Sequence, residues 1–305
     1  MIIPKMLVLD LDGTLLDDQK KINPKNLKLL RHLKEKYPQL LLSIATGRSY
    51  LISKNFAQKL KADFLITDDG GAIYKRINQN KYKLVQAFCL PEKASYSIYQ
   101  LLQKQAVLNS NLTWCMITGL IQYNALLSDK KGTLQKINQA FCPTEKLEQT
   151  NLLIFNDFKT LKELGLNTQI IKIITYFGQT KLGRQQSDEF KQHLHNYQLD
   201  CLQPLENLFT IHPLGVNKGS TLQYLLKDLK KIKPTEVITV GNDYNDLNML
   251  KLKGFHHYCP SNAAPEIKAL QGITILKQTN NQPWLKELLI HYSRTKHTLT
   301  PGHIR

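Results

Sequence analysis

The sequence predicts an α/β fold. We expect a doubly wound, Rossmann-like parallel-sheet core made from both ends of the chain, with a second α/β domain inserted between them. Short apolar runs of the buried-strand type alternate with amphipathic helical segments, which is the pattern of βαβ units. The texture changes near residue 80 and changes back near residue 210. We therefore predict a core domain of residues 1–79 and 207–305 and an inserted domain of residues 80–206.

The first predicted strand lies in the segment MLVLDLDGTLL, residues 6–16, in which four apolar residues run into Asp10, Asp12 and Gly13. An apolar run this short, bounded by Asp and Gly, is typical of a parallel strand buried on both faces. In open α/β sheets the ligand site lies beyond the carboxyl ends of the strands, which is where both aspartates fall. The structural alternative is an Asp-Gly turn that Asp10 caps.

The remaining elements follow from the same periodicity. For the N-terminal part of the core we expect helices over 24–37 and 49–60 and strands over 40–46 and 64–67. For the inserted domain we expect strands within 82–88, 112–118, 121–127, 152–155 and 170–178, and helices over 92–106, 132–141, 157–164 and 187–197. The C-terminal part should hold strands within 236–241, 256–260 and 273–276, helices starting near 217, 245, 263 and 283, and a frayed basic tail over 293–305.

Composition narrows the class of protein. The chain has 305 residues, of which 42% are hydrophobic and 21% charged, as in ordinary globular proteins. It contains no apolar segment of membrane-spanning length and no signal-type N-terminus, so we expect a cytoplasmic protein without membrane partners. Its cysteines are odd in number and widely scattered, which favours reduced structural thiols. They are Cys89, Cys115, Cys142, Cys201 and Cys259.

The net charge of +17, from 41 Lys and Arg against 24 Asp and Glu, could attract nucleic acid or an anionic small molecule. The lysines are nevertheless spread along helical segments and form no basic tract with interleaved aromatic residues. A solvated lysine-rich surface is the better interpretation, and a nucleic-acid partner is disfavoured. The histidine pairs at 193/195 and 256/257 lack the spacing of a helical zinc pair, and we interpret them as structural.

A second candidate site follows the second predicted strand. Thr46, Gly47 and Arg48 supply a hydroxyl, a position that permits close backbone approach, and a guanidinium, all at the start of a helix. Such a combination suits a phosphate group, because these donors and the helix N-terminus can converge on one anion. The alternative is that Thr46 is a helix N-cap and Arg48 is a surface residue.

Lys218 marks another helix start, in the segment NKGSTLQYLL. A cation there opposes the helix dipole, and an anionic ligand would reverse that cost. Since lysines are common throughout this chain, an ordinary surface lysine stays open as the alternative.

The segment VGNDYNDLNML places four polar side chains directly after a β-branched strand. They are Asn242, Asp243, Asn245 and Asp246. Carboxylate and amide oxygens are hard ligands of the kind that Mg²⁺ prefers. Asx residues also form turns and helix caps, so at least one of the four is expected to have a structural use.

These motifs occur in the order seen in haloacid-dehalogenase-type phosphatases: Asp10-x-Asp12-Gly13-Thr14, then ATGR, then a lysine before a helix, then GNDYND. The chain most resembles the Cof-type branch, in which a large α/β cap is inserted between the second and third motifs. The similarity covers roughly residues 5–77 and 205–290. Only the size and general pattern of the middle segment match a cap.

The resemblance implies a Mg²⁺-dependent phosphomonoesterase that acts on a small phosphorylated metabolite such as a sugar phosphate. It implies that Asp10 is the nucleophile and forms an aspartyl-phosphate. Asp12 would act as general acid and base, and its backbone carbonyl would bind the metal. The other implied roles are phosphate or substrate binding by Thr46, Gly47, Arg48, Lys218 and Asn245, and metal binding by Asp10 with Asn242, Asp243 or Asp246.

Two positions depart from the family pattern. Asn242 stands where the family has an aspartate that binds the metal, which removes one negative charge and should weaken Mg²⁺ binding. Asp243 is the alternative ligand if the loop shifts by one residue, with Asp246 as the remaining acid. Asp69 stands where the family has an asparagine. A carboxylate there would repel a phosphate unless it faces a lysine or a cationic part of the substrate.

Two other functions stay open at this point. The chain could transfer a phosphoryl group to an acceptor sugar, as the related mutases do. It could also be a catalytically weakened sensor of a phosphorylated ligand, an interpretation that Asn242 and Asp69 favour. The sequence leaves the substrate and the oligomeric state undetermined.

Overall fold

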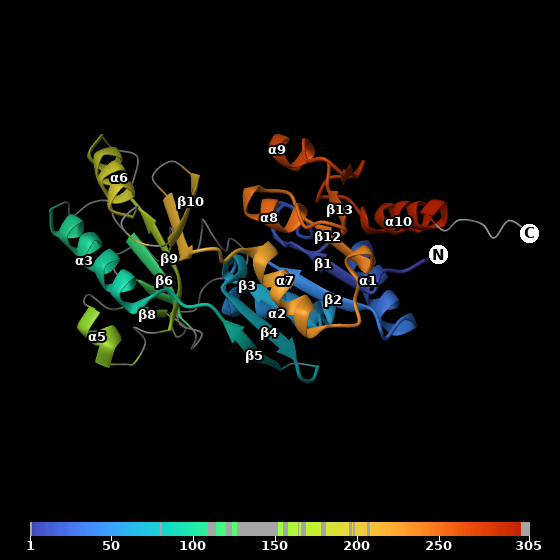
Figure 1. Cartoon of the computed structure of the whole chain (residues 1–305), viewed down its shortest axis with the longest axis horizontal. Coiled ribbons are helices and arrows are strands. Elements are labelled where there is room, and N and C mark those ends of the chain that lie inside the picture. Colours follow the sequence, from blue (N-terminus) through green and yellow to red (C-terminus); the bar gives the residue numbers. More distant parts are fainter. Residues whose placement is uncertain are drawn as a thin grey trace, which may run out of the picture. The chain divides into compact units, whose positions relative to one another are not determined.

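A computed structural model describes most of the chain. The described residues are 2–79, 81–108, 114–119, 124–126, 152–154, 158–163, 165, 169–177, 181–194, 197, 199–205 and 208–299. They divide into two units (Figure 1). The first unit comprises Met1–Gly47, Ser53–Leu84 and Lys218–Arg305, and the second comprises Arg48–Ile52 and Val85–Asn217.

The first unit is built on an eight-stranded sheet in the order β14-β13-β12-β1-β2-β3-β4-β5. Strands of the N-terminal part, blue in Figure 1, thus lie directly beside the orange strands of the C-terminal part. The strands from β14 to β3 are parallel, and β4 is antiparallel to β3. Their bounds are β1 Met6–Leu9, β2 Leu41–Ala45, β3 Phe64–Thr67, β4 Ala72–Arg76, β5 Tyr82–Ala87, β12 Val237–Val240, β13 His256–Cys259 and β14 Ile273–Ile275.

Both faces of this sheet are covered, as the apolar runs predict. Successive residues of a strand point to opposite faces, and Met6, Leu7, Val8 and Leu9 of β1 are all fully buried. Met6 and Val8 belong to a cluster that includes Leu222 of helix α7 (Lys218–Asp228) and Met249 of helix α8 (Leu247–Leu250). Burial on both faces is what sets β1 at the centre of the core.

The helices of the first unit begin and end close to the predicted positions. They are α1 Pro24–Lys36, α2 Tyr50–Leu60, α7 Lys218–Asp228, α8 Leu247–Leu250, α9 Pro265–Lys268 and α10 Leu285–Leu299, with 3₁₀ turns η1 Asp68–Gly70, η3 Pro234–Glu236 and η4 Tyr244–Asp246. Asn23 caps α1 through its side chain, which accepts a hydrogen bond from the Lys25 backbone N–H, and Pro24 occupies the first helical position.

The predicted frayed tail over 293–305 is wrong for its first seven residues, which α10 includes. Tyr292 and Ser293 are buried, and the Ser293 hydroxyl accepts a hydrogen bond of 3.0 Å from the Ile2 backbone N–H. Anchoring to the N-terminal segment therefore extends the helix beyond the point where the apolar pattern weakens.

The second unit contains a six-stranded sheet in the order β10-β11-β9-β6-β7-β8. All neighbours are antiparallel except β7 and β8. Its strands are β6 Trp114–Gly119, β7 Asn124–Leu126, β8 Leu152–Ile154, β9 Ile170–Tyr176, β10 Leu199–Leu205 and β11 Leu208–Pro213, and its helices are α3 Glu92–Leu108, α5 Phe158–Glu163 and α6 Lys181–Leu194.

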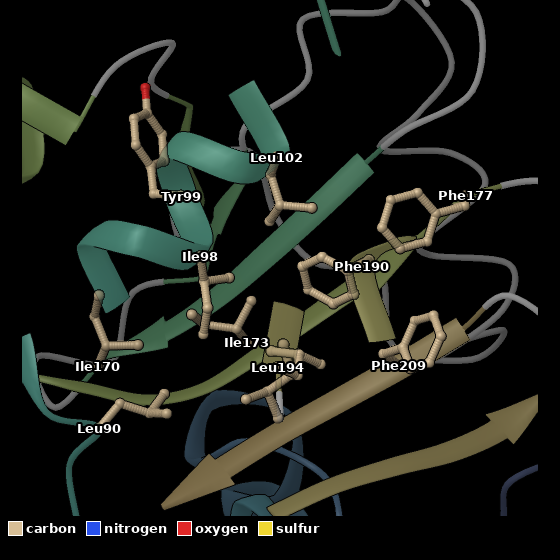
Figure 2. Close-up of a cluster of buried hydrophobic side chains, with 11 residues drawn as sticks. Leu90, Ile98, Tyr99, Leu102, Ile170, Ile173, Phe177, Phe190, Leu194 and Phe209 are labelled. Carbon is tan, nitrogen blue, oxygen red and sulfur yellow. The ribbon is translucent and has the colours of Figure 1, made fainter. Parts of the chain in front are cut away.

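The core of the second unit lies between its sheet and the helices α3 and α6. Figure 2 shows Ile98 and Leu102 of α3 above the sheet, with a group of aromatic rings beside them. The ring centroids of Phe177, Phe190 and Phe209 are 5.1 to 5.9 Å apart in tilted or edge-on arrangements. Such aromatic packing gives the second unit a hydrophobic core of its own.

Helix α6 begins at Lys181, six residues before the predicted start at 187. Its buried stripe consists of Gly183, Gln186, Ser187, Phe190 and Leu194, which have helical spacing but are small or polar in the first half. Hydrophobic periodicity cannot detect such a stripe. The helix predicted over 132–141 lies outside the described residues.

The two sheets take their strands from different parts of the chain. Strand β5 pairs in the first sheet, whereas β11, which follows the predicted boundary at 206, pairs with β9 and β10 in the second sheet. The division into core and inserted domain at residues 80 and 206 stays a prediction.

None of the described helices has both the length and the apolar character that crossing a membrane requires. The thiols of Cys89, Cys201 and Cys259 are free of disulfide bonds.

Candidate active site

The candidate site lies at the carboxyl ends of β12, β1, β2 and β3, which are parallel neighbours in the first sheet. The residues that follow these strands are Asn242, Asp10, Thr46 and Asp69. Because parallel strands end at the same edge of the sheet, motifs far apart in the sequence meet there.

Asp10 and Asp246 share one buried lysine. Lys218 Nζ donates hydrogen bonds of 2.8 Å to Asp10 Oδ1 and 2.7 Å to Asp246 Oδ1. The side chains of Lys218 and Asp246 are fully buried, and that of Asp10 is 5% exposed. Two carboxylates and one ammonium that are almost completely buried form a charged group, and the loss of any one member would leave a buried charge uncompensated.

Burial above all, and then the neighbouring Asp246 carboxylate, raise the pKa of Asp10 to about 7, against the lowering effect of the Lys218 ammonium. For Lys218, burial on its own lowers the pKa, but the carboxylates of Asp10 and Asp246, joined by that of Asp69, outweigh it and hold the pKa above its usual range. Lys218 is therefore a fixed cation, whereas Asp10 carries an electrostatic strain that further positive charge would relieve.

The Asn242 amide lies between Asp10 and Asp12. One of its terminal atoms is 2.7 Å from the Asp12 carbonyl oxygen, 3.2 Å from Asp10 Oδ2 and 2.8 Å from Thr14 Oγ1. Gly13 makes this approach possible, because a Cβ at that position would lie 2.4 Å from the other terminal atom of the amide. Gly13 also has φ of +71°, which favours glycine.

Asp243 and Asp246 serve the loop itself. The Asp243 side chain is exposed and accepts a 2.7 Å hydrogen bond from the Tyr244 backbone N–H, which caps η4. Asp246 Oδ2 accepts hydrogen bonds from the backbone N–H groups of Asn242 and Asp243. The sequence leaves Asn242 and Asp243 open as metal ligands, and the structure brings Asn242 next to Asp10 and Asp12. Both oxygens of Asp246 are already engaged, one with Lys218 and the other with the backbone of the loop.

Asn245 is joined to the loop after β3. Its Nδ2 donates a 2.9 Å hydrogen bond to Asp69 Oδ1. Asp69 is buried, has φ of +56°, and donates its backbone N–H to the Thr46 carbonyl at 3.1 Å. A Cβ on Gly47 would lie 2.8 Å from Asp69 Oδ1, so only glycine leaves room for this carboxylate.

The predicted phosphate-binding residues do not all belong to the same unit. Thr46, Gly47, Lys218 and Asn245 all belong to the first unit and lie at or beside the strand ends. Arg48 directly follows Gly47 and is buried, but it belongs to the second unit.

Sequence reasoning missed Lys20, whose Nζ donates a 2.8 Å hydrogen bond to Asp12 Oδ1. Lys20 has φ of +60° in a turn that Asp17 closes, since the backbone N–H of Lys20 donates to the Asp17 carbonyl at 2.9 Å. A non-glycine residue in this conformation is uncommon, and it becomes visible only in the structure.

A row of polar residues in the second unit was also missed. Lys172 of β9 pairs directly with Thr118 of β6, and His212 follows Ile211, the partner of Ile173. Ile173 and Ile211 belong to the core beneath the helices, so their neighbours Lys172 and His212 point to the opposite face of the sheet. A single polar residue inside an apolar strand, as in IIKIIT, is the signal that could have revealed them.

The oxygens beside Asn242 have the chemistry of a cation site. Asp10 Oδ2, the Asp12 carbonyl oxygen and the Asn242 amide oxygen can converge there, and all three are hard ligands suited to Mg²⁺. Within the part of the chain that the structure describes, no three Asp, Glu, His or Cys side chains form a metal-binding group. The donor set therefore fits Mg²⁺ by atom type, with one carboxylate fewer than the resemblance leads us to expect.

Comparison with known proteins gives a family match over most of the chain. Residues 7–282 match the haloacid dehalogenase-like hydrolase family. The chain belongs to this family. Its Rossmann-like fold with an inserted α/β segment is also confirmed by a haloacid dehalogenase-like hydrolase from Bacteroides thetaiotaomicron, whose structure aligns with a TM-score of 0.74 at 23% identity over 94% of this chain and 99% of that chain.

Two curated relatives are named phosphatases. The HMP-PP phosphatase of Serratia proteamaculans is 26% identical over 87% of each chain. The 5-amino-6-(5-phospho-D-ribitylamino)uracil phosphatase YwtE of Bacillus subtilis is 23% identical over 91% of this chain and 94% of its own. Together with the family match, they confirm the predicted enzyme class of this haloacid dehalogenase-like hydrolase, a phosphatase.

Proposed function

We propose that this enzyme hydrolyses the phosphate monoester of a small metabolite through an aspartyl-phosphate on Asp10, with Mg²⁺ as cofactor. The observation that carries the proposal is the setting of Asp10. Its carboxylate lies at the end of the central strand, with one oxygen held by Lys218 and the other facing the Asp12 carbonyl and the Asn242 amide. The names of relatives that act on small phosphorylated compounds support the substrate class.

In the first half of the reaction, an oxygen of Asp10 attacks phosphorus and the bond from phosphorus to the leaving oxygen breaks. The Asp12 carboxyl group gives its proton to that leaving oxygen. In the second half, Asp12 takes a proton from water, whose oxygen attacks phosphorus and releases inorganic phosphate and free Asp10. Division into two displacements, each assisted by proton transfer, is a general means of lowering the barrier.

Charge compensation is the main requirement, because an anionic nucleophile must approach an anionic substrate. Lys218 supplies one fixed positive charge beside Asp10. Mg²⁺ held by Asp10, the Asp12 carbonyl and the Asn242 amide would supply further positive charge at the phosphoryl group. Because burial and Asp246 raise the pKa of Asp10, additional positive charge at this site would favour the ionised, nucleophilic form of Asp10.

Thr46, Gly47 and Asn245 would bind phosphoryl oxygens, through a hydroxyl, a backbone N–H and an amide. Arg48 would reach the rest of the substrate. We propose that the second unit acts as the cap that recognises the leaving group.

The test is release of inorganic phosphate from a panel of sugar phosphates, nucleotides and p-nitrophenyl phosphate, with and without Mg²⁺, using Asp10→Asn as the blank. We expect Mg²⁺-dependent release from the wild type and none from the variant, which should remain folded. Turnover retained by Asp10→Asn would exclude Asp10 as the nucleophile.

Two other results would point to other functions. A product in which the phosphate has moved to another position, with little free phosphate, would identify a mutase-type transferase. Stabilisation by phosphorylated ligands without turnover would identify a sensor, the function that Asn242 and Asp69 favour.

A further inference from the structure

Either the nitrogen or the oxygen of the Asn242 side-chain amide can face Asp10 and Asp12. The terminal atom that faces Asp12 and Asp10 has three oxygens around it, at 2.7, 3.2 and 2.8 Å. If this atom is the amide nitrogen, it has an acceptor in the Asp12 carbonyl, in Asp10 Oδ2 and in Thr14 Oγ1. If it is the amide oxygen, it accepts only from the Thr14 hydroxyl and lies against two other oxygens with no proton between them.

The other end of the amide favours the first orientation as well. The terminal atom on that side faces hydrogen-bond donors only, so an oxygen there is satisfied and a nitrogen is not. Orientation of an amide is assigned from such a network of donors and acceptors. Without a cation, therefore, the nitrogen belongs next to Asp10 and Asp12.

We propose that Asn242 acts as a built-in substitute for the cation: its amide nitrogen bridges Asp10 and the Asp12 carbonyl in the metal-free enzyme, and the amide turns over to present its oxygen when Mg²⁺ binds. The proposal rests on the Mg²⁺ site of the proposed function. Thr14 serves both states, because a hydroxyl can accept from the nitrogen in one and donate to the oxygen in the other.

The surrounding backbone holds the amide in place for both states. The Asn242 backbone N–H donates to Asp246 Oδ2 at 2.8 Å, and its carbonyl accepts from the Ala264 N–H at 2.9 Å. Gly13 offers no Cβ against the amide, so the amide group has the space to turn without moving the main chain.

An aspartate at this position would behave differently. It would set a second carboxylate about 3 Å from Asp10 Oδ2, with Asp246 already sharing Lys218. The metal-free site would then be repulsive and the cation-bound site better neutralised. Compared with an aspartate at this position, Asn242 should bind Mg²⁺ more weakly but hold Asp10 in place when no cation is bound. This enzyme should therefore keep its nucleophile positioned when Mg²⁺ is scarce.

The experiment compares thermal unfolding in EDTA and in saturating Mg²⁺, with calorimetric titration of Mg²⁺, for the wild type and three variants. Asn242→Asp introduces the charge, and Asn242→Leu removes the amide without adding charge. Asn248→Asp is the matched control, because Asn248 is exposed on α8 and this substitution adds the same charge six residues further along the chain.

In EDTA, we expect the midpoint of unfolding of Asn242→Asp to fall by at least about 4 °C, while Asn248→Asp matches the wild type. In Mg²⁺, Asn242→Asp should gain more stability than the wild type and bind the ion on the order of tenfold more tightly. Asn242→Leu should lose stability in EDTA and show a smaller gain with Mg²⁺ than the wild type.

Equal midpoints for the wild type, Asn242→Asp and Asn242→Leu in EDTA would overturn the bridging role. Binding of Mg²⁺ to the wild type as tight as to Asn242→Asp would overturn the weaker Mg²⁺ binding expected of Asn242. A third result is that neither the wild type nor Asn242→Asp binds Mg²⁺, although their midpoints of unfolding in EDTA still differ. That result would overturn the metal site of the proposed function and the turning of the amide. It would leave only the bridge that Asn242 makes between Asp10 and Asp12.

Discussion

The Asn245 amide nitrogen donates a hydrogen bond of 2.9 Å to Asp69 Oδ1, although the two residues are 176 positions apart. This contact joins the loop after β12 to the loop after β3, which follow two of the four strands that end at the site. It gives a structural use to a carboxylate that would otherwise only repel an anionic substrate. The Asp69 carboxylate also helps to raise the pKa of Lys218 and so stabilises the charged form of this lysine.

We predict that Asp69→Asn keeps the contact and removes the repulsion. An asparagine oxygen can still accept from Asn245, and asparagine tolerates the φ of +56° found here. Inorganic phosphate should therefore inhibit the variant roughly threefold to tenfold more strongly, the effect of about 1 kcal/mol. Asp69→Ala is the contrast, since it leaves the Asn245 amide without this acceptor and should cost about 1–3 kcal/mol of stability. Weaker inhibition of Asp69→Asn by phosphate would contradict the prediction.

Lys20 should matter for turnover more than for stability. Its ion pair with Asp12 is 2.8 Å long, but the two side chains are 27% and 39% exposed, and exposed pairs stabilise proteins by less than about 1 kcal/mol. If Asp12 moves the proton as proposed, Lys20→Met should lower kcat by about tenfold and hardly change the unfolding midpoint. Lys21→Met is the matched control, because Lys21 is exposed and contacts Gln19. Equal kcat values for the two variants would show that Lys20 does not position Asp12.

The sequence allowed prediction of the strands that carry the site, because β1, β2, β3 and β12 are short apolar runs buried on both faces and followed at once by polar residues. It could not decide between Asn242 and Asp243, because a shift of one residue exchanges their directions and only the cap on Tyr244 fixes the register. Lys20 and the link from Asn245 to Asp69 were beyond reach, since both depend on side-chain contacts that leave no periodic pattern. Fold class and enzyme class are thus readable from the order of the motifs, while the positions of the individual donors are not.

His257 should make folding stability depend on pH. Burial lowers the pKa of His257 below its usual 6.5, in spite of the hydrogen bond to the Leu252 carbonyl, which raises it. The folded state therefore keeps a neutral imidazole at a pH where the unfolded chain already binds a proton, and stability is lost as the pH falls below about 6.5. We predict that the difference in unfolding free energy between the wild type and His257→Gln is larger near pH 7.5 than near pH 5. Urea denaturation at both values checks this, and a difference that stays constant or grows toward acid pH would contradict it.

Lys218 should be the most sensitive single position of the site. Lys218→Met keeps the length of the side chain but leaves Asp10 and Asp246 as buried carboxylates without their shared cation, which should cost about 3–5 kcal/mol at neutral pH. The sign of the pH dependence follows from Asp10, whose pKa is already raised to about 7 and loses its main lowering influence in the variant. Protonation then stabilises the folded state relative to the unfolded chain, so the variant should regain stability between about pH 7.5 and pH 5, by more than the wild type gains. Urea denaturation in EDTA measures this, with Lys227→Met on the exposed face of α7 as the matched control. A loss of stability that is the same at both pH values would show that Lys218 acts through packing alone and that its charge does not neutralise Asp10.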